Sequence, residues 1–231
     1  MLELFPRGFE EIERGARLEL AAYTDAEGAT GMWRAFGEFS ASDVEDGWED
    51  RWRRFHRPVR VGPLWIGPPW DEPPRSALAV VIDPGRAFGT GAHETTRLCL
   101  EFLLELDRGS LTDVGCGSGV LAIAAARLGY RFILAVDHDA VAVAAARQNA
   151  DANGVRIVVR RADALHEDLP VTDLVVANLS LGAVEGLAPR LGVARLVTSG
   201  YLASEQPALA GFDFVERRTR GGWAADLWRR D

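Results

Sequence analysis

Alternation of apolar and polar residues marks the start of this chain. Residues 8–13 and 16–24 alternate around a short break, which predicts a β-hairpin. A modest helix is expected over 26–38, followed by a short strand near 39–46. The pattern therefore predicts a small α+β domain over residues 1–45, whose core would be marginal on its own.

The next segment, 46–76, is expected to connect two domains. Trp48, Trp52 and Phe55 have the spacing of one helical stripe, and Pro58 would end that helix. Arginines surround the stripe, which fits either a solvated helix face or a nucleic-acid contact. Five prolines follow by residue 74, and they predict a stiff linker.

From residue 77 to the C-terminus at 231, strand-like and helix-like patterns take turns. This order predicts a doubly wound, mostly parallel sheet with helices on both faces. Two strand-like runs around Gly221–Gly222 predict an antiparallel hairpin at the sheet edge. The expected strands are 77–82, 111–114, 132–137, 156–163, 172–179 and 195–200, and the expected helices are 93–106, 118–129 and 139–153.

Charge and cysteine content narrow the class of protein. Residues 1–50 contain 13 acidic residues and 4 arginines, while the whole chain has a net charge of −8. This acidic part would suit a cationic partner or simply form a solvated surface, and it argues against nucleic-acid binding there. The two cysteines, Cys99 and Cys116, do not form a metal-binding motif, so no metal is expected. Because there is no long apolar run, we expect a cytoplasmic protein without a membrane contact.

The run DVGCGSG at 113–119 is a glycine loop between a strand and a helix. Gly115, Gly117 and Gly119 would let backbone N–H groups approach an anionic or zwitterionic ligand. GSGVLA also fits the dinucleotide fingerprint, so this loop alone leaves open a nicotinamide oxidoreductase, a methyltransferase or a turn without ligand.

Polar side chains occur at or after the ends of the three strands expected after this loop. Asp137 ends its strand 22 residues after Gly115, where an acid accepts hydrogen bonds from ribose hydroxyls, although it could also cap the following helix. Asp163 could bond an adenine amine or be an ordinary loop acid. Asn178 ends its strand at the carboxyl edge of the sheet, where open α/β folds bind ligands, and could bond an amine or a carboxylate.

A second glycine loop, AFGTGAHETT at 87–96, leads into a helix at the same edge. Thr95 and Thr96 would place hydroxyls in its first turn, either as caps or facing a ligand. His93 is a candidate proton acceptor or a packed, capping histidine. A dinucleotide enzyme has no evident need for this loop, which favours a methyltransferase.

These segments together resemble the PrmA family, the bacterial S-adenosylmethionine-dependent methyltransferases of the eleventh protein of the large ribosomal subunit. The resemblance rests on DPGRAFGTGAHETTRLCLE, DVGCGSGVLAIAAARLG, AVDHDAVAVAAARQNADANG and VVANL, and covers about residues 46–231. It implies a class I, Rossmann-like methyltransferase domain over 77–231 with a seven-stranded sheet. It also implies a substrate-recognition domain over 1–45, here a shortened, incomplete ferredoxin-like unit of ββαβ order.

The family's cofactor contacts can be carried over by position. Thr96, Gly115, Asp137 and Asn178 match contacts to S-adenosylmethionine, and Asp113 and Gly117 belong to the same loop. The resemblance implies N-methylation of lysine ε-amino or N-terminal α-amino groups of a basic ribosomal protein. We expect Asn178 to orient the amine and the protein to act as a monomer.

The sequence leaves two alternative functions open. The chain could methylate another protein or a small amine, since its N-terminal domain is short. It could also be a non-catalytic module that binds the cofactor and holds a basic partner through its acidic part.

Overall fold

The computed structural model describes residues 10–14, 17–21, 30, 33–34, 37, 57–83, 89 and 91–230. The chain divides into two compact units, Met1–Trp52 and Arg53–Asp231. In the described residues, no helix has the length and apolar character needed to cross a membrane.

The first unit contains the expected β-hairpin. Strand β1 (Glu10–Arg14) pairs antiparallel with β2 (Arg17–Ala21). Thr30, Trp33 and Arg34 are helical, within the helix expected over 26–38. The strand expected near 39–46 and the helix expected around Trp48, Trp52 and Phe55 lie outside the described residues.

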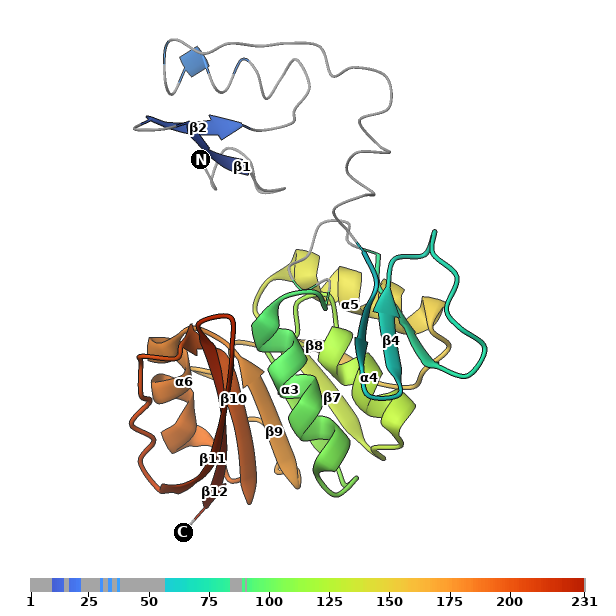
Figure 1. Ribbon diagram of the computed structural model, residues 1–231. Helices are drawn as coiled ribbons and strands as arrows, with labels where there is room; N and C mark the ends of the chain where they lie inside the picture. The colour runs from blue at the N-terminus through green and yellow to red at the C-terminus, as the bar shows by residue number, and fades with distance from the viewer. Residues whose placement is uncertain are drawn as a thin grey trace. The chain divides into compact units, whose positions relative to one another are not determined.

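The second unit is built on a seven-stranded sheet of order β11-β12-β10-β9-β6-β7-β8 (Figure 1). Strand β12 runs antiparallel to β10 and β11, and all other neighbours are parallel. The doubly wound sheet and its edge hairpin are therefore confirmed. The strands are β6 (Leu111–Val114), β7 (Ile133–Asp137), β8 (Val158–Arg161), β9 (Leu174–Asn178), β10 (Arg195–Leu202), β11 (Phe212–Arg220) and β12 (Trp223–Arg230).

Helices cover both faces of this sheet, so its central strands are apolar on both sides. On β9, Val176 packs into one hydrophobic cluster, while Val175 and Ala177 pack into another. The first cluster includes residues of α3 (Glu94–Glu105), α4 (Val120–Leu128) and α5 (Ala140–Ala152). The second includes residues of α6 (Leu181–Leu187) and of the 3-10 helix η1 (Ala188–Arg190). Continuous apolar runs are what a two-sided parallel sheet requires.

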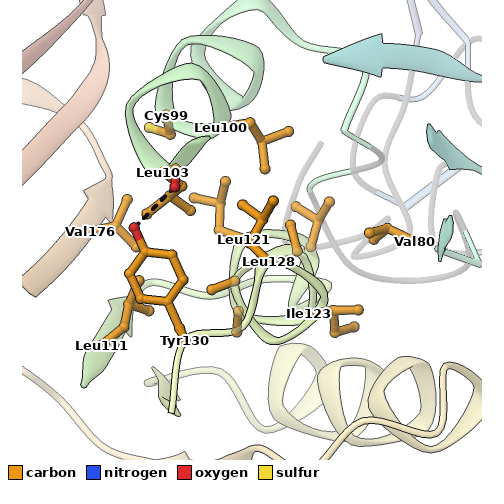
Figure 2. Packing of buried hydrophobic residues seen from close by; sticks show 14 of the residues in the cluster. Val80, Cys99, Leu100, Leu103, Leu111, Leu121, Ile123, Leu128, Tyr130 and Val176 are labelled. Atoms are coloured by element: carbon orange, nitrogen blue, oxygen red, sulfur yellow. Dashed lines mark hydrogen bonds between the residues drawn. The ribbon is translucent and has the colours of Figure 1, made fainter. Parts of the chain in front are cut away.

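Figure 2 shows the packing of α3 against α4. Leu100 and Leu103 of α3 lie beside Leu121 and Leu128 of α4. The Tyr130 hydroxyl donates a hydrogen bond of 3.1 Å to the Leu103 carbonyl oxygen, which satisfies this buried polar group. Thr95 and Thr96 therefore lie in the first turn of a helix that is packed against α4.

The structure of residues 57–83 differs from the prediction. The segment up to residue 76 was expected to be a stiff linker, and residues 77–82 were expected to form the first strand of the main sheet. Residues 57–83 instead form a separate three-stranded sheet, β3 (Val59–Val61), β4 (Leu64–Gly67) and β5 (Leu78–Val81). The prolines fall between these short strands, and the Pro63 carbonyl accepts the Leu78 N–H at 2.9 Å. Proline is disfavoured inside a strand because it has no N–H to donate. Short strands of three or four residues can still form between the prolines.

Side chains of α4 and α5 hold β5 and the residues after it. Asn153 accepts the Val81 N–H at 2.8 Å and donates to the Val81 carbonyl at 2.6 Å. Asn149 accepts the Asp83 N–H at 3.1 Å, and Arg127 donates to the Ala79 carbonyl at 2.9 Å. These hydrogen bonds therefore hold the chain in place as far as Asp83.

Candidate functional site

The glycine loop after β6 has the backbone conformation that its glycines permit. Gly115, Gly117 and Gly119 have φ values of 71°, 52° and 83°, which side-chain-bearing residues rarely adopt. A Cβ at Gly115 would lie 2.3 Å from Cδ2 of Leu179, the residue after β9, so this side chain would have to move, and the positive φ is the stronger reason for glycine there. The loop turns sharply at the carboxyl edge of the sheet.

Asp137, at the end of β7, is bound to this loop. Its Oδ2 accepts the Gly117 N–H at 3.0 Å, its Oδ1 accepts the Asp139 N–H at 3.0 Å, and its exposure is 8%. Asp139 is the N-cap of α5 and accepts the Val141 N–H at 2.9 Å. Asp137 is thus not needed as a cap, and a carboxylate has further acceptor sites beyond the two in use.

Asp113 belongs to β6, before the glycine loop, and its side chain is buried. It is 1% exposed, and its Oδ2 accepts the Ala122 N–H of α4 at 3.1 Å. Burial raises the pKa of this carboxyl to about 7, helped by the negative charge of Asp137 and opposed by the Ala122 hydrogen bond. Its observed contact supports α4 and the loop.

Asn178 ends β9 at the same edge and contacts the first turn of α3. Its Nδ2 donates to Oγ1 of Thr95 at 3.1 Å and to Oγ1 of Thr96 at 3.4 Å. Both threonines are 2% exposed, whereas Asn178 is partly exposed. The structure thus brings Asn178 and the two threonines together, although 82 or more residues separate them in the sequence.

His93 is the N-cap of α3, as one of the two sequence interpretations expected. Its Nδ1 lies 2.7 Å from Oγ1 of Thr95 and 3.4 Å from the Thr95 backbone nitrogen. The ring makes a T-shaped contact with Trp223, with centroids 4.8 Å apart. His93 therefore has a defined structural position next to Asn178's partner.

The loop at 87–96 is only partly described. Residues 84–88 and 90 lie outside the described part, so the expectation that this loop covers the ligand stays a prediction. The Ser118 hydroxyl donates to the Gly89 carbonyl, and Asn149 donates to the Ser118 carbonyl at 2.9 Å. These two residues connect both glycine loops with α5, and sequence reasoning missed them. For Asn149, the available signal was its spacing of four residues from Asn153 at the end of the expected helix.

Asp163 follows β8 and is engaged locally. It accepts the Leu165 N–H at 3.0 Å and lies 2.8 Å from Nδ1 of His166. The hydrogen bond with His166 holds its pKa below the ordinary value. In the described residues, no cluster of three or more potential metal ligands occurs.

The sheet order separates the two enzyme classes that the glycine loop left open. A Rossmann dinucleotide domain has six parallel strands in the order 3-2-1-4-5-6. Here an antiparallel strand, β12, lies between β10 and β11. This is the sheet of a class I, Rossmann-like methyltransferase.

Comparison with known proteins makes the assignment specific. The family model of the ribosomal protein L11 methyltransferase (PrmA) matches residues 19–227. The ribosomal protein L11 methyltransferase of Pseudomonas putida (strain GB-1) is 42% identical over 210 residues, which cover 84% of this chain and 72% of that protein. Its counterpart from Herpetosiphon aurantiacus is 34% identical over 242 residues, covering 87% and 74%.

A solved structure agrees with these sequence matches. The crystal structure of a ribosomal protein L11 methylase from Lactobacillus delbrueckii subsp. bulgaricus aligns with a TM-score of 0.68 and 30% identity, covering 76% of this chain and 100% of that one. This chain belongs to the ribosomal protein L11 methyltransferase (PrmA) family. It is a methyltransferase whose cofactor is S-adenosylmethionine.

Proposed function

We propose that the enzyme methylates lysine ε-amino groups, the N-terminal α-amino group, or both, of ribosomal protein L11. Family membership carries this proposal, because the match extends over residues 19–227 and the relatives are named for that substrate. The alternatives of another protein, a small amine or a non-catalytic module have no observation that favours them.

The residues at the carboxyl edge of the sheet fit S-adenosylmethionine. Asp137 is a nearly buried carboxylate with acceptor sites beyond its two backbone hydrogen bonds, which suits ribose hydroxyls. Gly115 and Gly117 donate their N–H groups to the Val136 carbonyl and to Asp137, so they suit a cofactor by leaving space beside the backbone, and Thr96 lies in the first turn of α3. We assign these four residues and Asn178 to cofactor binding. Asp113 would act indirectly, by holding the start of α4 through the Ala122 N–H.

The chemistry requires a neutral amine. S-adenosylmethionine supplies a methyl group on a positively charged sulfur, which an amine lone pair can attack. A free lysine has a pKa near 10.4, so holding it neutral at pH 7 costs about 4.6 kcal/mol at 1.36 kcal/mol per pH unit. A nearby positive charge and burial both favour the neutral amine, so this chain does not need a strong catalytic base.

Asn178 is suited to orient that amine. Both hydrogen bonds that the structure shows for its side chain are donated by Nδ2 to α3. Among the described residues, none donates to its Oδ1, so this oxygen can accept an N–H of the target amine. Alignment of the lone pair by such a contact contributes through orientation, which can be worth about 7–11 kcal/mol at best.

The acidic N-terminal part would bind the basic substrate. Residues 1–50 have 13 acidic residues against 4 arginines, and complementary potentials favour encounter with a cationic protein. We expect no direct nucleic-acid contact, a monomeric enzyme, and a reaction in the cytoplasm, where ribosomal proteins are made.

The test uses the purified protein, isotopically labelled S-adenosylmethionine and ribosomal protein L11, followed by intact-mass and peptide mass spectrometry. Label on L11 lysines or on its α-amine is the expected result. Binding of S-adenosylhomocysteine without any labelled L11 would refute the substrate assignment while leaving the cofactor assignment intact.

A further inference from the structure

The side-chain amide of Asn178 can be placed in two orientations of nearly the same shape. A rotation of 180° exchanges Oδ1 and Nδ2, which have opposite hydrogen-bonding roles. Only the orientation with Nδ2 toward α3 presents Oδ1 as an acceptor for an amine. The surroundings of Asn178 must therefore select this orientation.

The Thr95 hydroxyl makes this selection if its own proton is directed elsewhere. Its oxygen lies 3.1 Å from Asn178 Nδ2 and 2.7 Å from His93 Nδ1, and Thr95 is 2% exposed. His93 Nδ1 also accepts the Thr95 backbone N–H at 3.4 Å, as the N-cap of α3. A nitrogen that accepts this N–H carries no proton itself, so the Thr95 hydroxyl donates its single proton to His93.

As a result, each group in this hydrogen-bond chain has a fixed role: Asn178 donates to Thr95, and Thr95 donates to His93. With its proton committed to His93, Thr95 can only accept from Asn178, and only Nδ2 can donate to it. The edge-to-face contact of the His93 ring with Trp223, at 4.8 Å and 70°, holds the ring in place for this role. The contact from Nδ2 to Thr96 at 3.4 Å favours the same amide orientation.

We propose that His93 and Thr95 are positioning residues that set the orientation of the Asn178 amide, so that Oδ1 faces the target amine. His93 acts through Thr95, and Thr95 acts through Asn178. The inference rests on the proposed amine-orienting role of Asn178 and extends it to residues that do not contact the substrate.

The first arm of the test compares Thr95→Val, which removes the hydroxyl at nearly constant shape, with Thr95→Ser, which keeps it. Thr112→Val is the matched control. Thr112 is also a buried threonine, its hydroxyl oxygen lies 3.1 Å from that of Thr172, and it precedes the end of β6 that leads into the glycine loop. In single-turnover methylation of L11, we expect Thr95→Val to be about threefold to tenfold slower, the effect of one hydrogen bond. Thr95→Ser and Thr112→Val should keep the wild-type rate, and the Kd for S-adenosylhomocysteine and the KM for L11 should not change.

The second arm tests the order of the chain. His93→Phe keeps an aromatic ring on Trp223 and removes Nδ1, so the Thr95 proton is no longer directed. We expect a smaller rate decrease than for Thr95→Val, and no further decrease when both changes are combined, because His93 acts only through Thr95. Multiplicative effects in the double variant would show that His93 acts independently and would overturn this part.

The third arm does not depend on activity. The side-chain NH₂ signals of Asn178 in the cofactor-free protein are assigned by nuclear magnetic resonance from their loss in Asn178→Ala. Thr95→Val should shift these signals and speed their exchange with water, while Thr112→Val should leave them unchanged.

Three results would overturn the proposal. Unchanged Asn178 signals in Thr95→Val would show that Thr95 does not hold the amide. Equal rate losses in Thr95→Ser and Thr95→Val would assign the effect to packing of the methyl group. A weaker Kd at an unchanged rate would make Thr95 a cofactor contact. If wild-type enzyme does not methylate L11, the substrate assignment fails, and the resonance arm still decides whether Thr95 holds the amide.

Discussion

At the scale of single residues, the side chains of the site are held in fixed orientations by hydrogen bonds. The site depends on these orientations more than on strongly acidic, basic or nucleophilic groups. Asn178 is neutral, and its amide is fixed by hydroxyls of α3. Asp137 is fixed by two backbone N–H groups. Asp113, by contrast, has its pKa raised to about 7 by burial first and by the nearby Asp137 second. One buried carboxyl in this site thus titrates near neutral pH.

This shift predicts a pH dependence of stability. Because the folded pKa of Asp113 is above its ordinary value, the folded protein binds this proton more tightly, and stability is lost as pH rises toward 7. Asp113→Asn removes this dependence. Relative to wild type, its free energy of unfolding should rise by about 1.4 kcal/mol per pH unit between roughly pH 4 and 7.

Urea unfolding of the cofactor-free proteins at several pH values measures this difference. A difference that stays constant from pH 5 to 7 would show that the Asp113 carboxyl is ionised throughout that range in the folded protein.

At the scale of elements, the sequence predicted what depends on local pattern. The strands that carry Asp137 and Asn178 were predicted from buried runs, and Asn178 was expected at the carboxyl edge of the sheet, where open α/β folds bind ligands. The β1–β2 hairpin was predicted from alternation around a short break, and the β11–β12 hairpin from two strand-like runs around Gly221–Gly222.

What the sequence left open depends on contacts between distant segments. Strand β4 was missed because its four residues lie between prolines, and its pairing with β5 is fixed partly by Asn153, far along the chain. The direction of the His93–Thr95–Asn178 chain depends on where α3 begins against β9, and on Trp223 beside His93. Periodicity carries no information on such contacts.

The C-terminal hairpin contains a buried ion pair that local pattern also could not predict. Asp226 of β12 is fully buried and accepts two hydrogen bonds of 2.8 Å from Arg217 of β11, and the Tyr201 hydroxyl donates to it at 2.9 Å. Asp226 is removed from water, whereas the Arg217 side chain is 20% exposed, and the guanidinium offsets the free-energy cost of burying the carboxylate. Arg217 and Asp226 lie directly opposite each other in the pairing of β11 with β12, so the pair forms in this register of the hairpin.

Arg217→Met should lower the free energy of unfolding by about 3–5 kcal/mol, because it leaves the Asp226 charge buried without its partner. Adding Asp226→Asn should recover part of this loss, since the unpaired charge is then gone. Chemical denaturation of the two variants measures both effects, and a double variant that is less stable than Arg217→Met would contradict this account.

At the scale of the whole molecule, charge is distributed unevenly between the two ends of the sequence. Residues 1–50 have far more acidic than basic residues, whereas the whole chain's net charge is only −8. Attraction between exposed charges weakens as salt is added, since the Debye length falls to about 8 Å at 0.15 M ionic strength. Recognition of a basic substrate should therefore depend on salt, while cofactor binding should not.

We expect the KM for L11 to rise severalfold as NaCl increases from about 50 to about 300 mM, with kcat and the Kd for S-adenosylhomocysteine nearly constant. Steady-state kinetics and calorimetry over the same salt series measure these quantities. A KM independent of salt would mean that the acidic part of the chain is only a solvated surface.

In the proposed mechanism, amine and cofactor meet at Asn178, on the carboxyl edge of the sheet. The most direct measurement compares wild type with Asn178→Ala in single-turnover methylation of L11, alongside the Kd for S-adenosylhomocysteine. We predict a rate at least about 100-fold lower, as for loss of an orienting contact in the reacting complex, and a Kd within about tenfold of wild type. A wild-type rate in Asn178→Ala, with the cofactor bound normally, would contradict the account.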